Sequence, residues 1–137
     1  MDASAGKRTY RDLQQHLEEL KARDLLYVID EPVNKDTEMS ALVRWQFRGG
    51  LREDQRKAFL FNDVTDSKGR QYDIPVVIGA LAANQDIYAT GMDTSVDGIA
   101  AKWDHAIANP VKPRLLNEAP CQDVIIEGDD LLAEDGG

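Results

Sequence analysis

Apolar residues near the start of the chain recur at steps of three and four, which predicts an amphipathic helix. Thr9 is the expected N-cap of this helix, and Asp12 takes the capping-box position three residues later. The opposite side of the helix is polar and charged, as expected for a solvated face. The apolar face consists of Tyr10, Leu13, Leu17 and Leu20.

The pattern then changes to a strand and afterwards to a second helix. Residues 25–29 form an apolar run that is too short for a helix and rich in strand formers. Pro32 ends this strand because proline donates no hydrogen bond to a sheet. Asp36 or Thr37 opens the next helix, and the glycines at 49–50 end it. The apolar residues along that helix are Met39, Leu42, Val43, Trp45 and Phe47.

The middle of the chain predicts two strands joined by a loop. Residues 58–61 and 74–78 are the strand candidates, and residues 66–69 supply turn-forming side chains between them. The proline of the second strand stands near its beginning, where it is tolerated. Gly79 closes that strand.

Two further helices and a last strand follow. Asn84 is the expected cap of a short helix that Gly91 ends, and another helix starts at one of residues 93–95. Two prolines within residues 109–113 end it and favour an extended connector. Residues 124–126 predict a strand, with a turn at Gly128 after it. The apolar residues of the later helix are Ile99, Trp103, Ala106 and Ile107.

Short strands that alternate with amphipathic helices predict an α/β (α+β) fold, a small mixed sheet flanked by helices. We assign residues 9–131 to a single domain of this kind. Residues 1–8 are expected to form a flexible N-terminal tail, and residues 132–137 an acidic flexible tail.

Charge and composition narrow the function classes. The sequence has 16 basic and 25 acidic residues, a formal net charge of −9, which argues against binding a nucleic-acid backbone. No apolar run is long enough to span a bilayer, and residues 1–7 lack the core of a signal peptide. Cys121 is the single cysteine, which excludes an internal disulfide and fits the reducing cytoplasm.

The residues that could carry chemistry do not form a recognisable catalytic pattern. We expect His16 and His105 each at a solvated helix flank. A metal-binding role is not expected for either, because metal sites need several converging ligands. Cys121 has no histidine or basic neighbour in sequence and is interpreted as a small buried side chain. The acidic pairs at 129–130 and 134–135 lack the spacing of a calcium loop. Gly79, Gly91 and Gly98 do not have the spacing of a phosphate-binding fingerprint.

Three stretches nevertheless contain motifs. The first partly matches a pattern of an R-D-L-x-x-(F/L)-L-x-x-L-E helix, a strand ending in I-x-x-P-V and a second helix ending in glycine. The second partly matches the pattern A-L-L-F-x-N-x-x-G…P-V-V-x-(G/N). The third, at residues 119–131, follows A-P-C-Q-E-V-V-x-x-G-x-D-(V/L) nearly residue for residue. In the first two the matching residues are Arg11, Asp12, Leu13, Leu17, Leu20, Ile29, Glu31, Pro32, Val33, Glu38, Gly50, Ala58, Leu60, Phe61, Asn62, Gly69, Pro75, Val76, Val77 and Gly79.

These motifs resemble the N-terminal domain of the UbiD family of prenylated-FMN-dependent decarboxylases. In that family the catalytic equipment lies downstream of the third motif, and no residue of this chain matches it. The resemblance therefore implies no catalytic, cofactor-binding or metal residue here. It implies instead a non-catalytic small subunit, or detached N-terminal domain, of a heteromeric UbiD-like decarboxylase acting on an aromatic or α,β-unsaturated carboxylic acid.

The resemblance also implies a partner. A larger UbiD-like catalytic subunit would hold prenylated FMN, a divalent metal (Mn or Mg) and K, and this chain would pack against it and stabilise it. The size of Trp45 and Trp103 makes them the candidate apolar contacts. Two alternatives stay open: a stand-alone binding or scaffold protein without a decarboxylase partner, and a truncated piece of a longer enzyme.

Overall fold

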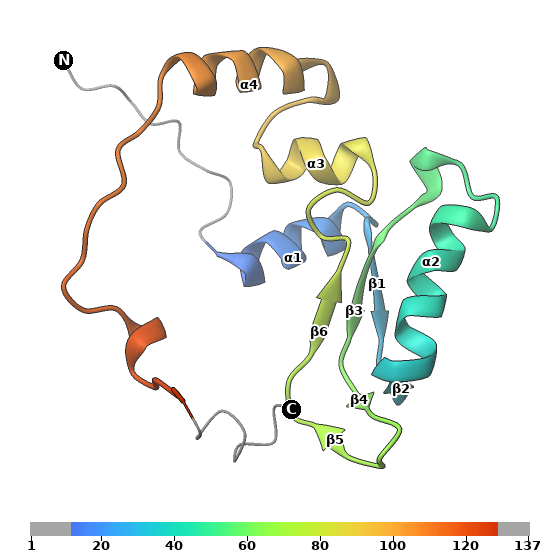
Figure 1. The fold of residues 1–137 in the computed structure, drawn as a ribbon. Coiled ribbons are helices and arrows are strands. Elements are labelled where there is room, and N and C mark those ends of the chain that lie inside the picture. The colour runs from blue at the N-terminus through green and yellow to red at the C-terminus, as the bar shows by residue number, and fades with distance from the viewer. Residues whose placement is uncertain (1–11, 129–137) are drawn as a thin grey trace.

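The fold is built on a three-stranded sheet with the strand order β1-β3-β6 (Figure 1). β1 (Leu26–Ile29) runs parallel to the central strand β3 (Ala58–Phe61), and β6 (Val76–Ile78) runs antiparallel to it. The strands predicted at residues 25–29, 58–61 and 74–78 are confirmed, the first and third with fewer residues than expected. The sheet is mixed, as the sequence pattern predicted.

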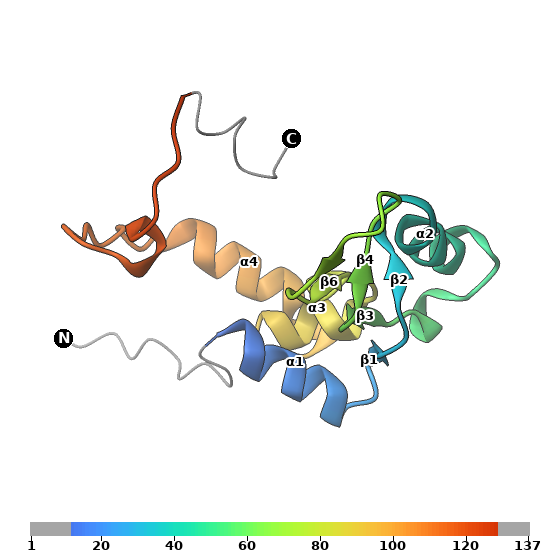
Figure 2. The ribbon, with the colours of Figure 1, turned by 90° about the horizontal axis from the view of Figure 1, so that it is seen from below.

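Helices cover both faces of this sheet because side chains alternate along its strands. Ala58 and Leu60 of β3 face α1 (Leu13–Ala22) and α3 (Gln85–Gly91), which add Leu17, Leu20 and Ile87 to one apolar cluster. The next residues along β3, Phe59 and Phe61, face the opposite way. They belong to a second apolar cluster, to which α2 (Ser40–Arg48) adds Val43 and the segment just before it adds Met39. Val33 and Val64 complete this cluster. Figure 2 shows from below that the sheet lies between α1 and α3 on one side and α2 on the other.

The structure describes residues 12–128, and α1 begins one residue into that range. Asp12 has an extended backbone, and its carboxylate accepts a hydrogen bond of 3.0 Å from the Gln15 N–H. The prediction of Thr9 as N-cap is therefore wrong: Asp12 takes that role, because helical geometry begins only at Leu13. Thr9 itself and Tyr10 lie outside the described residues.

α2 is entered through a short π-helix, η1 (Lys35–Met39). The Asn34 side chain caps it by accepting from the N–H groups of Asp36 at 2.9 Å and Thr37 at 3.2 Å. The predicted start at Asp36 or Thr37 is therefore wrong by one or two residues, since the asparagine before them already satisfies their N–H groups. Gly49 is the C-cap of α2, as predicted.

A second small sheet, with the order β2-β4-β5, was not predicted. β2 (Val33–Asn34) and β4 (Val64–Thr65) pair in parallel, and β5 (Gln71–Tyr72) closes an antiparallel hairpin with β4. Two-residue strands are too short to show a period of their own. They form because β1 and β3 already lie side by side, so the chains that continue from them stay neighbours.

Two other predicted boundaries are confirmed around the first sheet. Gly79 follows β6 with a φ of +79°, a left-handed conformation that favours glycine. The Asn84 side chain caps α3 by accepting from the Ile87 N–H at 2.7 Å. The 3₁₀ turn η2 (Glu53–Gln55) lies in the connection from α2 to β3.

The C-terminal part lies beside this assembly. A 3₁₀ turn, η3 (Val96–Gly98), leads into α4 (Ile99–Ala108), so the α-helix begins later than the predicted 93–95, and Asn109 ends it as expected. The chain then runs without regular structure to a 3₁₀ turn, η4 (Pro120–Gln122). No helix in the described part has the length and apolar character needed to cross a bilayer.

The predicted strand at residues 124–126 is wrong. No strand pairing between described residues includes them, although the expected turn at Gly128 is present with a φ of +62°. Strand-forming side chains give a strand only where a second strand is available to pair with, and no described strand lies alongside these residues.

Candidate functional site

His16 does not lie at a solvated flank. Its side chain is buried between α1 and the segment after β6, and Nε2 donates to the Ala80 carbonyl oxygen at 2.7 Å. The prediction fails because the helix period shows which positions lie on one face but not which distant segment covers them. In this position His16 ties α1 to the end of β6, a structural role.

The remaining candidate residues also lie apart from one another. His105 is exposed on α4, as predicted, and its carbonyl oxygen accepts a hydrogen bond of 2.9 Å from the Asn109 side chain. Cys121 belongs to η4, but its side chain is outside what the structure describes, as are the acidic pairs at 129–130 and 134–135. Across residues 12–128, no group of three or more His, Cys, Asp or Glu side chains could hold a metal ion.

A buried carboxylate organises the β4–β5 hairpin. Asp66 accepts hydrogen bonds from the Arg70 N–H and the Lys68 N–H, both at 2.9 Å. It also accepts from Arg70 Nε at 3.0 Å and from the Tyr72 hydroxyl at 2.9 Å. These donors, the Arg70 backbone N–H first, hold the pKa of Asp66 far below its ordinary value. Because its partners all belong to the hairpin, this cluster stabilises a turn.

Gln46 is a second buried polar group that the sequence did not single out. Its side-chain amide bonds the backbone of Lys57 twice, donating to the carbonyl oxygen at 2.9 Å and accepting from the N–H at 2.8 Å. The pair fixes α2 against the approach to β3. Nothing in the local sequence marks this glutamine, because its partner lies eleven residues away.

The exposed side of α2 carries apolar surface. Leu42 and Trp45 stand between two shallow hollows of about 410 Å³ and 280 Å³, and the Trp45 side chain is 63% exposed. The other residues that line the first hollow come from the β1–β2 connection, β2, η1 and α2. The second hollow borders the outer edge of β1, next to the tilted ring pair of Tyr27 and Phe59, whose centroids are 5.5 Å apart.

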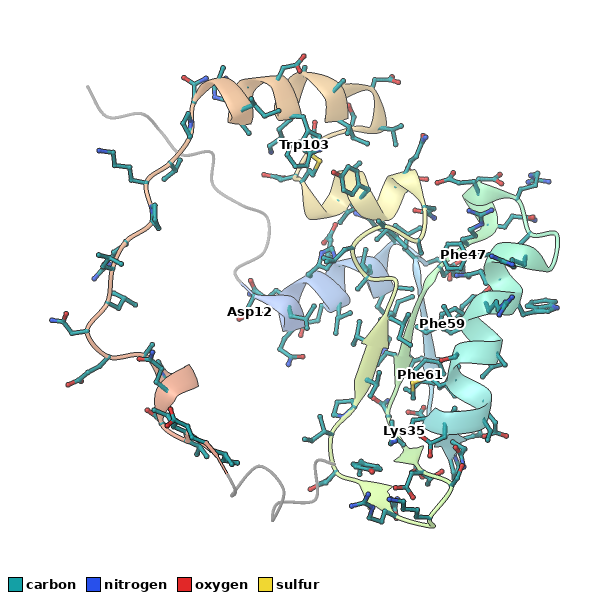
Figure 3. The ribbon with its side chains drawn as sticks, viewed as in Figure 1. Asp12, Lys35, Phe47, Phe59, Phe61 and Trp103 are labelled. Carbon is teal, nitrogen blue, oxygen red and sulfur yellow. The ribbon has the colours of Figure 1, made fainter. Side chains whose placement is uncertain are left out.

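α4 contributes a second apolar surface. Trp103 points from α4 toward α3 (Figure 3), and its indole N–H donates to the Tyr88 hydroxyl at 2.7 Å. The ring is nevertheless 48% exposed, and none of the α4 residues is buried. Ile107 lies one turn further along the helix and is more exposed still. The contact to Tyr88 holds the helix in place without covering its apolar side.

We call residues 110–128 the arm. It leaves α4 and runs apart from the sheet in both views (Figures 1 and 2). No residue of the arm whose side chain is described is buried, and Leu115 is 93% exposed. The two prolines within residues 109–113 predict the extended connector, whereas the exposed apolar character of the arm was not predicted. The large exposed apolar side chains are Val111, Leu115, Leu116, Val124, Ile125 and Ile126.

Comparison with known proteins identifies relatives of this chain. Residues 17–115 match the family model for the 3-octaprenyl-4-hydroxybenzoate carboxy-lyase N-terminal domain, UbiD_N. No curated protein matches the sequence.

Two similar solved structures are of the UbiD-class enzyme HmfF from Pelotomaculum thermopropionicum. An evolved dimeric form in complex with prFMN aligns with a TM-score of 0.58 and 26% identity, covering 78% of this chain and 22% of that one. A second, in complex with FMN, aligns with a TM-score of 0.56 and 28% identity, covering 76% of this chain and 20% of that one. The chain thus spans about a fifth of the length of these enzymes, and the shared part is the N-terminal domain fold.

Proposed function

Because this chain belongs to the UbiD family, through its N-terminal domain, we propose that it serves as a non-catalytic small subunit of a heteromeric UbiD-like decarboxylase. A detached N-terminal domain would act in the same way. The observation that carries the proposal is the match of an N-terminal domain model over residues 17–115, in a chain that covers only 22% of a solved UbiD-class enzyme.

In this proposal the larger partner supplies the chemistry. That partner would bind prenylated FMN, a divalent metal (Mn or Mg) and K, and the cofactor would take up the electron pair of the broken C–C bond as an aromatic or α,β-unsaturated acid loses CO2. The prFMN in the HmfF complex supports this expectation for the partner. The present chain would stabilise the catalytic subunit by packing against it through exposed apolar surface. We place the pair in the cytoplasm, in keeping with a single cysteine.

The test is affinity capture of the full chain from its source cells, followed by mass spectrometry and an absorbance spectrum. We expect co-recovery of a larger UbiD-like chain in fixed ratio, with flavin absorbance. Recovery of this chain alone, from cells shown to express such a partner, would contradict the proposal and favour a stand-alone scaffold. Stoichiometric binding of prenylated FMN by the purified chain alone would contradict the non-catalytic role.

A further inference from the structure

We propose that the arm, residues 110–128, is the element that docks this chain onto the catalytic part of a UbiD-like enzyme. Within the arm, residues 124–126 would add a strand to an open sheet edge of that partner. The identity of the partner rests on the proposed function.

The arm exposes more apolar surface than a connector needs. Its apolar side chains are spread over its length, and Val111 and Leu115 are 92% and 93% exposed. Large exposed apolar areas on a folded protein are typical of interaction sites. Burial of such side chains gains free energy in proportion to the apolar area removed from water. Contact with a partner would therefore bury apolar surface that the arm leaves exposed to solvent in this chain.

The arm is also stiffened for an extended conformation. Pro110, Pro113 and Pro120 fix their own φ angles and disfavour helical geometry in the residues before them. A segment whose free conformations are already restricted loses less entropy when it is bound. Three of the chain's five prolines lie in this segment, which favours binding in an extended form.

Residues 124–126 have the composition of a strand buried on both faces. Val124 and Ile126 would point to one side of a strand and Ile125 to the other. An uninterrupted β-branched run is typical of strands covered on both faces, whereas half-exposed strands alternate with polar residues. These three residues are exposed, and none of them pairs with another strand among residues 12–128. Addition to a partner's sheet would satisfy both their backbone groups and their side chains.

The position of the arm indicates which partner it meets. The matching family model describes an N-terminal domain, so the remainder of a relative's chain follows that domain in sequence. The arm comes after the sheet and its helices, and the match to the N-terminal domain model ends within it, at residue 115. The same surface can therefore serve a domain of one chain or a separate subunit. The hollows beside Trp45 do not lie where the remainder of a relative's chain would follow, so Trp45 serves as the matched control for the arm.

The experiment compares two substitutions in otherwise intact chains, used as bait in the affinity capture. Ile125→Asp places a charge in the arm, and Trp45→Asp places one beside the α2 hollows; the two wild-type side chains are 68% and 63% exposed. We expect Ile125→Asp to reduce co-recovery of the UbiD-like chain by about tenfold or more, and Trp45→Asp to leave it within about twofold. Because both side chains are exposed, both variants should unfold at the wild-type midpoint.

Hydrogen exchange of the purified complex supplies an independent measurement. The amides of residues 124–126 should exchange rapidly in the free chain and become protected with the partner, because strand pairing engages them. Loss of the partner with Trp45→Asp but not with Ile125→Asp would overturn the arm assignment and leave the proposed function intact. Protection in the free monomer would show pairing with the chain's own sheet. A dimer abolished by Ile125→Asp would show a second copy as the occupant. If wild-type bait recovers no UbiD-like chain, the proposed function fails and the assigned partner with it.

Discussion

Two regions of this chain contain similar apolar residues, but one region buries them and the other leaves them exposed. The first, residues 12–98, buries Leu17, Leu20, Phe61 and Ile87 between helices and a sheet. The second, residues 99–128, has no buried residue among those whose side chains are described. The difference teaches that apolar character alone does not place a residue in a core. A second element must lie close enough to cover it.

The largest effect should come from a residue at the centre of the first region. Phe61→Ala removes a fully buried ring and should lower the free energy of unfolding by about 3–5 kcal/mol. Leu115→Ala removes an exposed side chain from the second region and should change it by less than about 0.5 kcal/mol. Urea denaturation followed by circular dichroism measures both. Equal losses would show that the arm is packed against the rest of the chain.

A smaller effect is expected from the buried glutamine of α2. Gln46→Ala leaves the N–H and carbonyl of Lys57 without their side-chain partner and should lower the free energy of unfolding by about 1–3 kcal/mol. The neighbouring Trp45→Ala is the control, because that side chain is exposed and its removal should matter far less. Urea denaturation measures both losses of unfolding free energy. A larger loss for Trp45→Ala than for Gln46→Ala would place the α2 apolar face inside the core.

The helix cap of α1 tests the edge of the first region. Asp12→Ala removes the acceptor for the Gln15 N–H and should lower the free energy of unfolding by about 1 kcal/mol. Asp12→Asn retains an oxygen that can accept and should restore most of the loss. An alanine variant as stable as the wild type would indicate that α1 has its functional cap elsewhere.

The most local effect is a pH dependence in the β4–β5 hairpin. The pKa of Asp66 is lowered from its ordinary 3.8 in the folded chain, chiefly by the Arg70 backbone N–H. A lowered folded pKa gives stability that is present above 3.8 and is lost as the pH falls through the folded value. The difference in unfolding free energy between wild type and Asp66→Asn should shrink from about pH 5 to about pH 2. A constant difference between wild type and Asp66→Asn across the same range would contradict the assigned role of the Asp66 charge.

The sequence by itself determined the main strands and helices of the first region, but not its second sheet. The strand at 58–61, the strand expected at 74–78 and observed at 76–78, the glycine stop at Gly49 and the cap at Asn84 each depend on a few consecutive residues. The motifs that resemble the UbiD family lie in short stretches of sequence, and the family match over residues 17–115 confirms the resemblance. Local geometry and turn chemistry act over such short distances, which is why they can be read from sequence.

Only the tertiary structure decided which residues are covered. His16 is buried because the segment after β6 lies over it, and Gln46 because Lys57 offers its backbone. Residues 124–126 have the composition of a strand, yet no other strand in the described part of the chain lies beside them to pair with. Burial and strand pairing depend on segments that are distant in sequence, so a local pattern can predict an element without predicting its partner.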